Sequence, residues 1–258
     1  MKKQFCFTVD DNIRFLKELT ERRQGSIFDH PYLAVYRRLH EKHGVKIQLN
    51  LFYECEGFTL ADMTDAYRKE FAENADWLKM SFHSRIENVH PYREAPYREV
   101  YRDADFVQRE IVRFASPAML AKTTTLHFCT ATAEGLRAMY DTGTRGLLGL
   151  YGDMESPRTS YQTKESAAAR IRAGEVVTED GIAYAGIDIV LNCFLREENA
   201  ARLSRLLDRP LIKVMIHEQY FYPDYSYYQP DFEEKLDAVF ATLTAAGYQS
   251  TFFELVIN

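Results

Sequence analysis

The first apolar run of the chain, residues 4–9, is followed directly by two adjacent carboxylates, Asp10 and Asp11. Two carboxylates are costly to place side by side unless a metal ion or a shared proton relieves their repulsion. The carboxyl end of a strand is also where parallel α/β folds gather their catalytic groups. The pair therefore predicts a site for metal binding or acid–base chemistry at the mouth of a sheet.

A second group of candidate ligands is His83, Glu87 and His90, which are four and three residues apart. On a helical turn this spacing brings the side chains to one face, where they can hold a single divalent ion. Combined with Asp11, one carboxylate and one or two imidazoles would suit Zn²⁺ or another first-row metal. The alternative is structural: His83 ends a strand, and His90 is a surface residue before a proline.

His217 closes the apolar run 211–216, a pattern typical of a central strand. A histidine in this place can act as a general acid or base near neutral pH, and a core histidine bonded to the backbone is the alternative. The segment 220–228 that follows contains Tyr220, Tyr222 and three further tyrosines. Their rings suit contact with a sugar or a lid over a site, and a packed loop or a subunit contact explains the segment equally well.

The elements that must position these residues alternate between strands and helices along the chain. Strands are predicted at 4–9, 45–52, 78–83, 123–129, 146–150, 187–192, 212–217 and 250–255. Helices are predicted at 12–23, 31–43, 60–74, 103–121, 133–140, 197–207 and 231–246, with a loop and a short helix over 151–181. Strands separated by helices run parallel, which predicts one α/β domain over residues 1–258. An irregular (β/α) barrel of seven or eight mostly parallel strands fits this pattern, and an open sheet is the alternative.

Parallel strands of a barrel end at one rim, and the predicted strand ends are rich in polar groups. The residues at or near these ends are Asp10, Asp11, Phe52–Glu54, His83, His127, Asp188, His217 and Glu218. Three of the seven histidines lie among them, which favours a functional site over scattered surface residues.

Composition excludes several classes of protein. The chain has 258 residues, 46% of them hydrophobic, and a formal net charge of −6 with both signs interspersed. A nucleic acid partner is not expected, and no run approaches the ~20 apolar residues that span a membrane. The four cysteines lack CxxC spacing, which suggests buried thiols in a reducing cytosol. Because the charged start leads into a strand rather than a signal peptide, a cytoplasmic location is expected.

Together the motifs resemble the polysaccharide deacetylase (NodB-homology) family, metal-dependent hydrolases built on an irregular (β/α) barrel. Residues 8–12, Thr-Val-Asp-Asp-Asn, resemble its Thr-Phe-Asp-Asp-Gly signature, and residues 83–87 resemble its His-Ser/Thr-x-x-His signature. Residues 214–218, Val-Met-Ile-His-Glu, are similar to its late strand ending in His-Asp. The passage 43–47 and the closing stretch 232–255 are similar as well, so the ordered resemblance covers most of the chain.

The resemblance implies a role for each matching residue. Asp10 would be the general base, Asp11 and His83 would be metal ligands, and His217 would be the general acid. The metal would be a divalent ion, Zn²⁺ in the first place, with Co²⁺, Ni²⁺ or Mn²⁺ as alternatives. It would activate a water molecule and polarise the carbonyl of an amide or ester.

Two departures from the family pattern leave the site incomplete. Glu87 replaces the second histidine of the metal motif, so either Glu87 or His90 must complete the ligand set. The family's Arg-x-Pro-Tyr motif is missing, and residues 125–129, Thr-Leu-His-Phe-Cys, stand in its place. His127 is therefore a candidate substitute, as an extra ligand or an electrophile. Asp188 lies near the position of a supporting acid in the family.

Three functions are compatible with these observations. The first is a metal-dependent hydrolase that removes an acyl group from a saccharide or a related small amide or ester. For this function, substrate contacts are predicted at His127, Asp188, Tyr220 and Tyr222. The second is a catalytically degenerate barrel that binds carbohydrate, and the third is a glycosidase that pairs Asp10 with Glu54 or Glu218. No membrane or nucleic acid partner is needed for any of them, and a homo-oligomer is compatible with all three.

Overall fold

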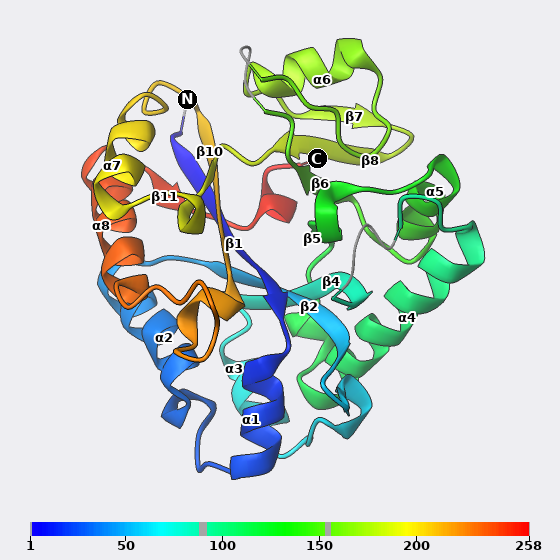
Figure 1. The fold of residues 1–258 in the computed structure, drawn as a ribbon, viewed down its shortest axis with the longest axis vertical. Helices are drawn as coiled ribbons and strands as arrows, with labels where there is room; N and C mark the ends of the chain where they lie inside the picture. The colour runs from blue at the N-terminus through cyan, green and yellow to red at the C-terminus, as the bar shows by residue number, and fades with distance from the viewer. Residues whose placement is uncertain (1, 88–91, 153–155, 258) are drawn as a thin grey trace.

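The longest strands, among them β1, β2, β4 and β10, lie in one part of the molecule, and β5 to β8 lie in the other (Figure 1). The computed structural model describes residues 2–87, 92–152 and 156–257. Within these ranges, a seven-stranded sheet contains β1 (Gln4–Asn12), β2 (Ile47–Cys55), β3 (Phe58–Thr59), β4 (Leu78–Ile86), β9 (Ile189–Val190), β10 (Leu211–His217) and β11 (Gln249–Ser250). A four-stranded sheet contains β5 (Thr123–Thr124), β6 (Gly146–Gly149), β7 (Val177–Glu179) and β8 (Ile182–Gly186). The α-helices are α1 (Arg14–Arg22), α2 (Pro31–His43), α3 (Arg68–Glu73), α4 (Tyr97–Phe114), α5 (Ala133–Asp141), α6 (Glu165–Arg172), α7 (Arg196–Ser204) and α8 (Phe232–Ala245).

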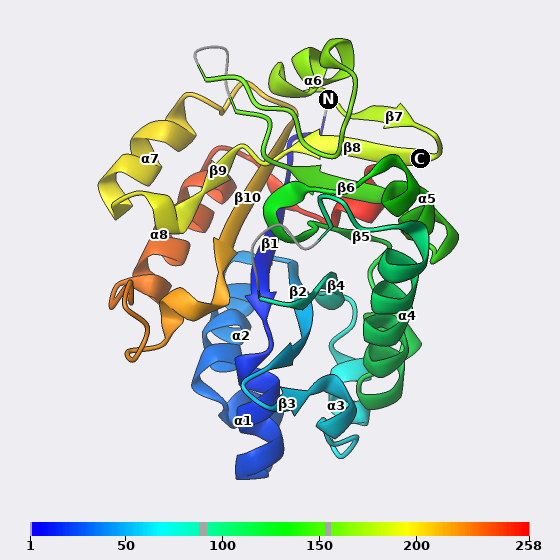
Figure 2. The same ribbon diagram turned by 45° about the vertical axis from the view of Figure 1, so that its right-hand side comes forward.

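The strands follow one another in the order of an irregular barrel (Figure 2). Across the described residues, every pairing of these strands is parallel except β2–β3 and β7–β8. The larger sheet has the order β3-β2-β1-β10-β9, with β4 on β2 and β11 on β1, and the smaller has the order β5-β6-β8-β7. A parallel bridge from Met80 of β4 to Leu120, just before β5, links the sheets at one edge. On the other side the chain passes from β8 of the smaller sheet directly to β9 of the larger sheet, which pairs with β10. The predicted α/β barrel architecture is confirmed.

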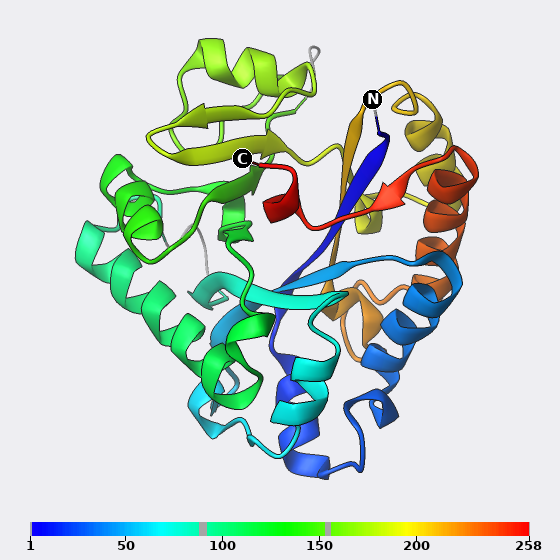
Figure 3. The ribbon, with the colours of Figure 1, turned by 180° about the vertical axis from the view of Figure 1, so that it is seen from behind.

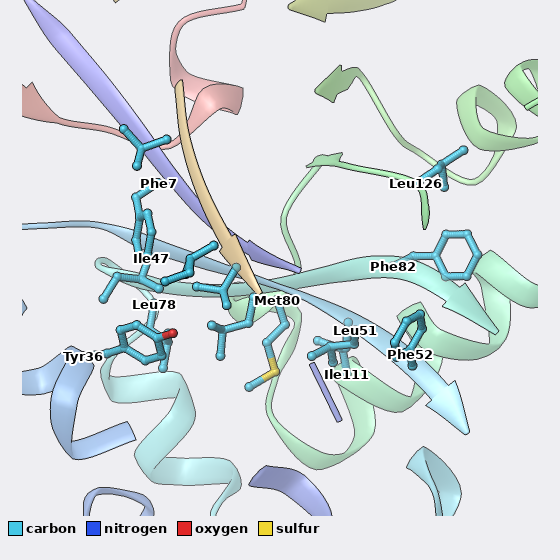
Figure 4. Packing of buried hydrophobic residues seen from close by; sticks show 14 of the residues in the cluster. Phe7, Tyr36, Ile47, Leu51, Phe52, Leu78, Met80, Phe82, Ile111 and Leu126 are labelled. Atoms are coloured by element: carbon cyan, nitrogen blue, oxygen red, sulfur yellow. The ribbon is translucent and has the colours of Figure 1, made fainter. Parts of the chain in front are cut away.

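The apolar faces of the long strands pack against the surrounding helices. Ile47 and Leu51 of β2 are fully buried in a hydrophobic cluster that also contains Tyr36 of α2 and Ile111 of α4 (Figure 4). Ile47 and Leu51 are four residues apart, a spacing that puts both side chains on the same face of the strand. Burial of this face stabilises the sheet by removing apolar surface from water.

The opposite face of β2 fills the interior with polar side chains. Gln48 and Asn50 are buried, and the Gln48 Nε2 donates hydrogen bonds to Asn50 Oδ1 and to the carbonyl oxygen of Thr123, both at 2.8 Å. The Ser81 hydroxyl of β4 donates to the same Asn50 oxygen at 2.5 Å. A satisfied buried network of this kind fixes the position of each member. It connects the long strands to β5 of the smaller sheet.

Several predicted elements end earlier than expected. The strand predicted at 123–129 is wrong beyond Thr124, because Phe128 and Cys129 have φ values of 58° and 54°, which a strand does not tolerate. The strand predicted at 250–255 is reduced to β11, which lies beside β1 (Figure 3), and a 3₁₀ turn follows it. The segment 151–181 contains α6 and β7, close to the prediction. In the described ranges no helix is long and apolar enough to cross a membrane.

Candidate metal centre

A bulge in β1 places both carboxylates of the Asp10–Asp11 pair in the same region. Val9 pairs with Leu49 of β2, but Asn12 pairs with Leu51, so β1 has one extra residue between them. Asp11 accordingly has a φ of 64°, a backbone conformation that few residues other than glycine adopt. Neighbours on a regular strand would point to opposite faces. Here both carboxylates are buried and both act on the same histidine.

That histidine, His83, lies at a second bulge, where β4 gains one residue relative to β2. Its Nδ1 is 2.5 Å from the carbonyl oxygen of Thr125, so Nδ1 donates its proton there. Nε2 is thereby left as the nitrogen that can bind a metal ion, and it lies 2.9 Å from Oδ1 of Asp11. This tautomer is the one a metal ligand requires.

His127 completes a triangle of ligand atoms from the other sheet. It lies on the 3₁₀ turn His127–Cys129 after β5. Its Nδ1 is 3.1 Å from Nε2 of His83 and 3.3 Å from Oδ1 of Asp11. The Phe52 ring packs at 5.3 Å from the His83 ring and 5.1 Å from the His127 ring, and this apolar contact holds both imidazoles in place.

These three residues fit a divalent metal ion. Ligands at 2.0–2.1 Å from a tetrahedral ion lie about 3.3 Å from one another, close to the observed 2.9–3.3 Å. One carboxylate and two imidazoles are a donor set that zinc and neighbouring metals accept. The second oxygen of Asp11, Oδ2, accepts a hydrogen bond of 2.7 Å from the Gln219 side chain, which orients the carboxylate.

The charges of the group are interdependent. Burial opposes ionisation of Asp11, but its contacts with His127 and His83 outweigh burial and hold its pKa well below the usual value. Burial likewise opposes protonation of His83, but the Asp10 and Asp11 carboxylates outweigh it and raise the His83 pKa. Without a metal, a proton on His83 therefore relieves the negative charge of the two acids.

Asp10 is the carboxylate placed to act as a base. It is 2% exposed, and burial raises its pKa. Its Oδ1 accepts a hydrogen bond of 2.6 Å from the side-chain nitrogen of Asn50. This hydrogen bond from the amide fixes the orientation of the carboxylate.

His217 lies opposite Asp10 in the pairing of β10 with β1. Its Nδ1 donates to the side-chain oxygen of Asn192 at 2.8 Å, because that oxygen can only accept. Nε2 is then the nitrogen that can exchange a proton with another molecule. The ring of Tyr220 lies 6.1 Å from the His217 ring, centroid to centroid.

A pocket of about 150 Å³ lies beside Asp11. Arg14, Lys17, Glu87 and Tyr225 are among the residues that line it. The Arg14 side chain pairs with Asp224 at 2.7 Å, so part of the charge in its wall is already compensated. Of the ligand triangle, Asp11 is among the residues that line the pocket, whereas His83 and His127 are not.

The structure brings some predicted site residues together and leaves others apart. Glu87 is exposed at the pocket and does not belong to the ligand triangle, and His90 lies outside the described residues. Asp188 accepts from the backbone nitrogen of Lys213 at 2.7 Å and pairs with its Nζ at 2.9 Å, which ties the start of β9 to β10. Tyr222 is among the residues that line the pocket beside Asp11, but it is only 4% exposed and therefore presents little surface to a substrate.

Glu218 and Tyr222 form part of the structure around α1. The Glu218 carboxylate accepts hydrogen bonds from the backbone nitrogens of Ile13, Arg14 and Phe15 at 2.7, 3.0 and 2.8 Å. The Tyr222 hydroxyl donates to the same carboxylate at 3.1 Å. This arrangement caps the start of the helix.

Sequence reasoning missed three amides that orient the site: Asn50, Asn192 and Gln219. A signal existed for Asn50, because Gln48 and Asn50 are polar at alternate positions of an otherwise apolar strand. Asn192 and Gln219 belong to 3₁₀ turns next to strand ends, and no pattern in the sequence distinguishes them from surface residues.

Comparison with known protein structures shows which fold the chain has. No family sequence model matches the chain, and no curated protein matches it in sequence. A family 4 acetyl xylan esterase from Clostridium thermocellum, in complex with a cobalt ion, matches with a TM-score of 0.56 at 11% identity, over 98% of this chain and 90% of that one. A peptidoglycan N-acetylglucosamine deacetylase matches with a TM-score of 0.50 at 11% identity, over 98% and 87%. The chain has the polysaccharide deacetylase fold.

The same fold extends to a larger carbohydrate-active protein. A 4-α-glucanotransferase from Thermococcus litoralis matches with a TM-score of 0.62 at 13% identity, over 99% of this chain and 40% of that one. This chain thus spans less than half the length of the glucanotransferase. At such low identity the likeness establishes the deacetylase fold alone, and that part of the motif resemblance is confirmed.

Proposed function

We propose that the chain is a metal-dependent hydrolase that removes an acyl group from a saccharide or a related small amide or ester. The proposal is carried by one observation: Asp11 Oδ1, His83 Nε2 and His127 Nδ1 form a triangle with edges of 2.9–3.3 Å. The buried base Asp10 lies next to it in sequence, and the fold is that of an acetyl xylan esterase.

The three ligands leave room for chemistry at the metal. A divalent ion held by Asp11, His83 and His127 would act as a Lewis acid that polarises the acyl carbonyl and activates water. Three nitrogen or oxygen ligands with an open position are typical of catalytic zinc, so Zn²⁺ is the first choice. Co²⁺, Ni²⁺ and Mn²⁺ are alternatives for the same donor set.

Asp10 is the proposed general base. Burial raises its pKa, so its carboxylate holds a proton more strongly than an exposed aspartate would. The hydrogen bond from Asn50 fixes Oδ1, which leaves Oδ2 as the atom that accepts a proton from the attacking water.

His217 is the proposed general acid. Its Nδ1 is held by Asn192, so a proton on Nε2 can pass to the leaving oxygen or nitrogen. Base and acid come from paired positions on the neighbouring strands β1 and β10, which places both residues at the same end of the sheet, next to one another.

The glycosidase alternative has less support. It requires a second carboxylate free to act with Asp10. Of the two candidates, Glu218 is occupied by three backbone nitrogens at the start of α1, so Glu54 of β2 is the one that remains. The degenerate barrel differs from our proposal only in its lack of turnover, so experiment must separate these two.

Metal analysis combined with hydrolysis assays tests the proposal. We expect about one transition metal ion per purified chain, and acetate release from at least one acetylated saccharide in a panel. A chelator should abolish release and added Zn²⁺ should restore it, while Asp10→Asn should keep the metal and lose turnover. Bound metal without any hydrolysis would support the degenerate barrel. Absence of metal, or hydrolysis that resists chelators, would contradict the proposal.

A further inference from the structure

The three candidate ligands are oriented by different means. Gln219 orients Asp11 through a hydrogen bond of 2.7 Å to Oδ2. The carbonyl oxygen of Thr125 orients His83 by accepting from its Nδ1 at 2.5 Å. His127 is 8% exposed, and among the described residues no group forms a hydrogen bond with its Nε2. Because a ligand imidazole is usually oriented by a hydrogen bond on its second nitrogen, the position of His127 must be set by the turn that carries it.

The turn that carries His127 has a backbone conformation that needs support. It is closed by a hydrogen bond of 2.7 Å from the backbone nitrogen of Cys129 to the carbonyl oxygen of Leu126. Phe128 and Cys129 have φ values of 58° and 54°, in the left-handed region that favours glycine. Such conformations persist only where surrounding contacts impose them. The place of His127 therefore depends on contacts between this turn and other parts of the chain.

Tyr161 makes hydrogen bonds to the chain on both sides of His127. It lies in the loop between β6 and α6 and is 1% exposed. Its hydroxyl accepts a hydrogen bond of 3.2 Å from the backbone nitrogen of Leu126. Its own backbone nitrogen donates to the carbonyl oxygen of Cys129, also at 3.2 Å. Tyr161 thus contacts the start and the end of the turn.

The same hydroxyl acts on His83 through a single peptide group. The backbone nitrogen of Leu126 and the carbonyl oxygen of Thr125 belong to one peptide group, whose plane is rigid. Tyr161 binds the N–H end of this group, and His83 Nδ1 donates to the C=O end. Because consecutive hydrogen bonds fix one another, the contact of Tyr161 also limits where the His83 ring can lie.

Tyr161 is itself fixed against β6. Its hydroxyl donates to the carbonyl oxygen of Leu148. Its ring lies over Gly149, where an added Cβ atom would be 2.8 Å from a carbon atom of the ring. The neighbouring Ser160 hydroxyl donates to the carbonyl oxygen of Leu150 at 2.9 Å. A continuous series of contacts therefore leads from β6 through Tyr161 to both imidazoles of the candidate metal centre.

We infer that Tyr161 is a positioning residue for both imidazole ligands, His127 and His83. Without its hydroxyl, the backbone nitrogen of Leu126 loses its acceptor, so the turn and the peptide group before it are no longer fixed from β6. The ligand atoms would then leave the spacing of 2.9–3.3 Å that suits a metal ion. This effect on metal binding rests on the proposed function, whereas the effect on the two rings does not.

Substitutions around the hydroxyl test the inference by calorimetry with Zn²⁺. Tyr161→Phe should lower Zn²⁺ affinity by about 10-fold or more, the effect typical of residues that orient a ligand. Gly149→Ala keeps the hydroxyl but displaces the ring, and it should lower the affinity as well. Tyr184→Phe is the matched control. Its ring lies beside Tyr161, 6.1 Å away, but it belongs to β8 and pairs with Leu147, so its affinity should equal that of the wild type.

NMR of the metal-free protein measures the positions of the rings without Zn²⁺. In Tyr161→Phe, the ring signals of His127 and the Nδ1 proton signal of His83 should both shift, because both depend on the peptide group that Tyr161 holds. Tyr184→Phe should leave these signals close to those of the wild type. Urea unfolding of each variant shows that the spectra compare folded proteins.

Unchanged Zn²⁺ affinity in Tyr161→Phe would overturn the inference. So would an equal loss of affinity in Tyr184→Phe, or a loss without any shift of the histidine signals, since both results indicate a general effect on stability. A wild-type chain that binds no Zn²⁺ would contradict the proposed function instead. The NMR comparison still decides the inference in that case, because shifted signals support the positioning role and unshifted signals contradict it.

Discussion

The two sheets hold their parts of the candidate site by different means. In the larger sheet, β1, β2 and β4 each contain nine residues, and Asp11 and His83 lie at bulges within their paired strands. In the smaller sheet, β5 contains two residues, and His127 follows it on a 3₁₀ turn. Backbone hydrogen bonds between paired strands fix the positions of Asp11 and His83. The position of His127 must instead be fixed by side chains that contact its turn.

This difference separates the expected effects of substitution. Around the long strands, amides such as Asn50 orient side chains whose backbone is already fixed. Loss of such an amide should therefore lower the rate of turnover. Around the short strands, Tyr161 orients the backbone itself, so its loss should affect metal affinity. Variants on the two sides can therefore be distinguished by turnover at saturating metal.

The largest effect is expected for the ligands. His127→Ala should lower Zn²⁺ affinity by at least about 100-fold, as should His83→Ala, because each removes a direct ligand rather than an orienting group. Glu87→Gln should leave affinity unchanged, since Glu87 lies outside the triangle. Calorimetry and metal analysis measure this directly. If His127→Ala kept the wild-type Zn²⁺ affinity, or if Glu87→Gln lost it, the third ligand would have to lie in the segment after β4, as the sequence motif predicted.

A smaller effect on turnover is expected for Asn50→Leu. Without the 2.6 Å hydrogen bond, Asp10 loses the contact that orients it, and kcat should fall by roughly 10²-fold, at the lower end of the range for general-base catalysis. Zn²⁺ affinity should stay close to wild type, which is the reverse of the pattern expected for Tyr161→Phe. Steady-state kinetics at saturating metal measures kcat. Equal kcat in both proteins would show that Asn50 only fills the interior.

The long-strand side was the more predictable from sequence. Asp10, His83 and His217 end apolar runs of ordinary length, so their common rim follows from the parallel arrangement. The strand predicted at 123–129 was wrong at its end because the residues there have the apolar character of a strand. No residue type in the neighbouring sequence indicates the positive φ of Phe128 and Cys129. The contact between Tyr161 and this turn joins residues more than thirty positions apart, which periodicity cannot detect.

A stability difference between the two sides is expected at their helix caps. Glu218→Ala leaves three backbone nitrogens at the start of α1 without their acceptor and should lower the free energy of unfolding by about 3 kcal/mol. On the other side, Thr132 caps α5 through one hydrogen bond of 3.0 Å to the Gly135 nitrogen, and Thr132→Ala should lose about 1 kcal/mol. Urea unfolding compares the two. Similar losses would mean that α1 does not depend on its carboxylate cap.

The smallest effect is a pH dependence of the metal-free protein. Because the His83 pKa is raised in the folded state, protonation of His83 favours folding. Its contribution is fully present below the unfolded pKa of about 6.5 and is lost as pH rises through the folded pKa. Over that interval the free energy of unfolding should fall by up to about 1.4 kcal/mol per pH unit. The raised pKa of Asp10 gives a contribution of the same sign, lost as pH rises from about 3.8 through its folded value.

Bound metal should reverse this slope. Zn²⁺ requires His83 without a proton on Nε2, so metal competes with the proton and stabilises the folded chain more as pH rises. Urea unfolding between pH 6 and 9, with chelator and with excess Zn²⁺, compares the two conditions, and His83→Asn should remove most of the difference. If His83→Asn kept the full slope without metal, the charge that neutralises Asp10 and Asp11 would have to lie elsewhere. His127, held from the short-strand side, would then be the group to substitute next.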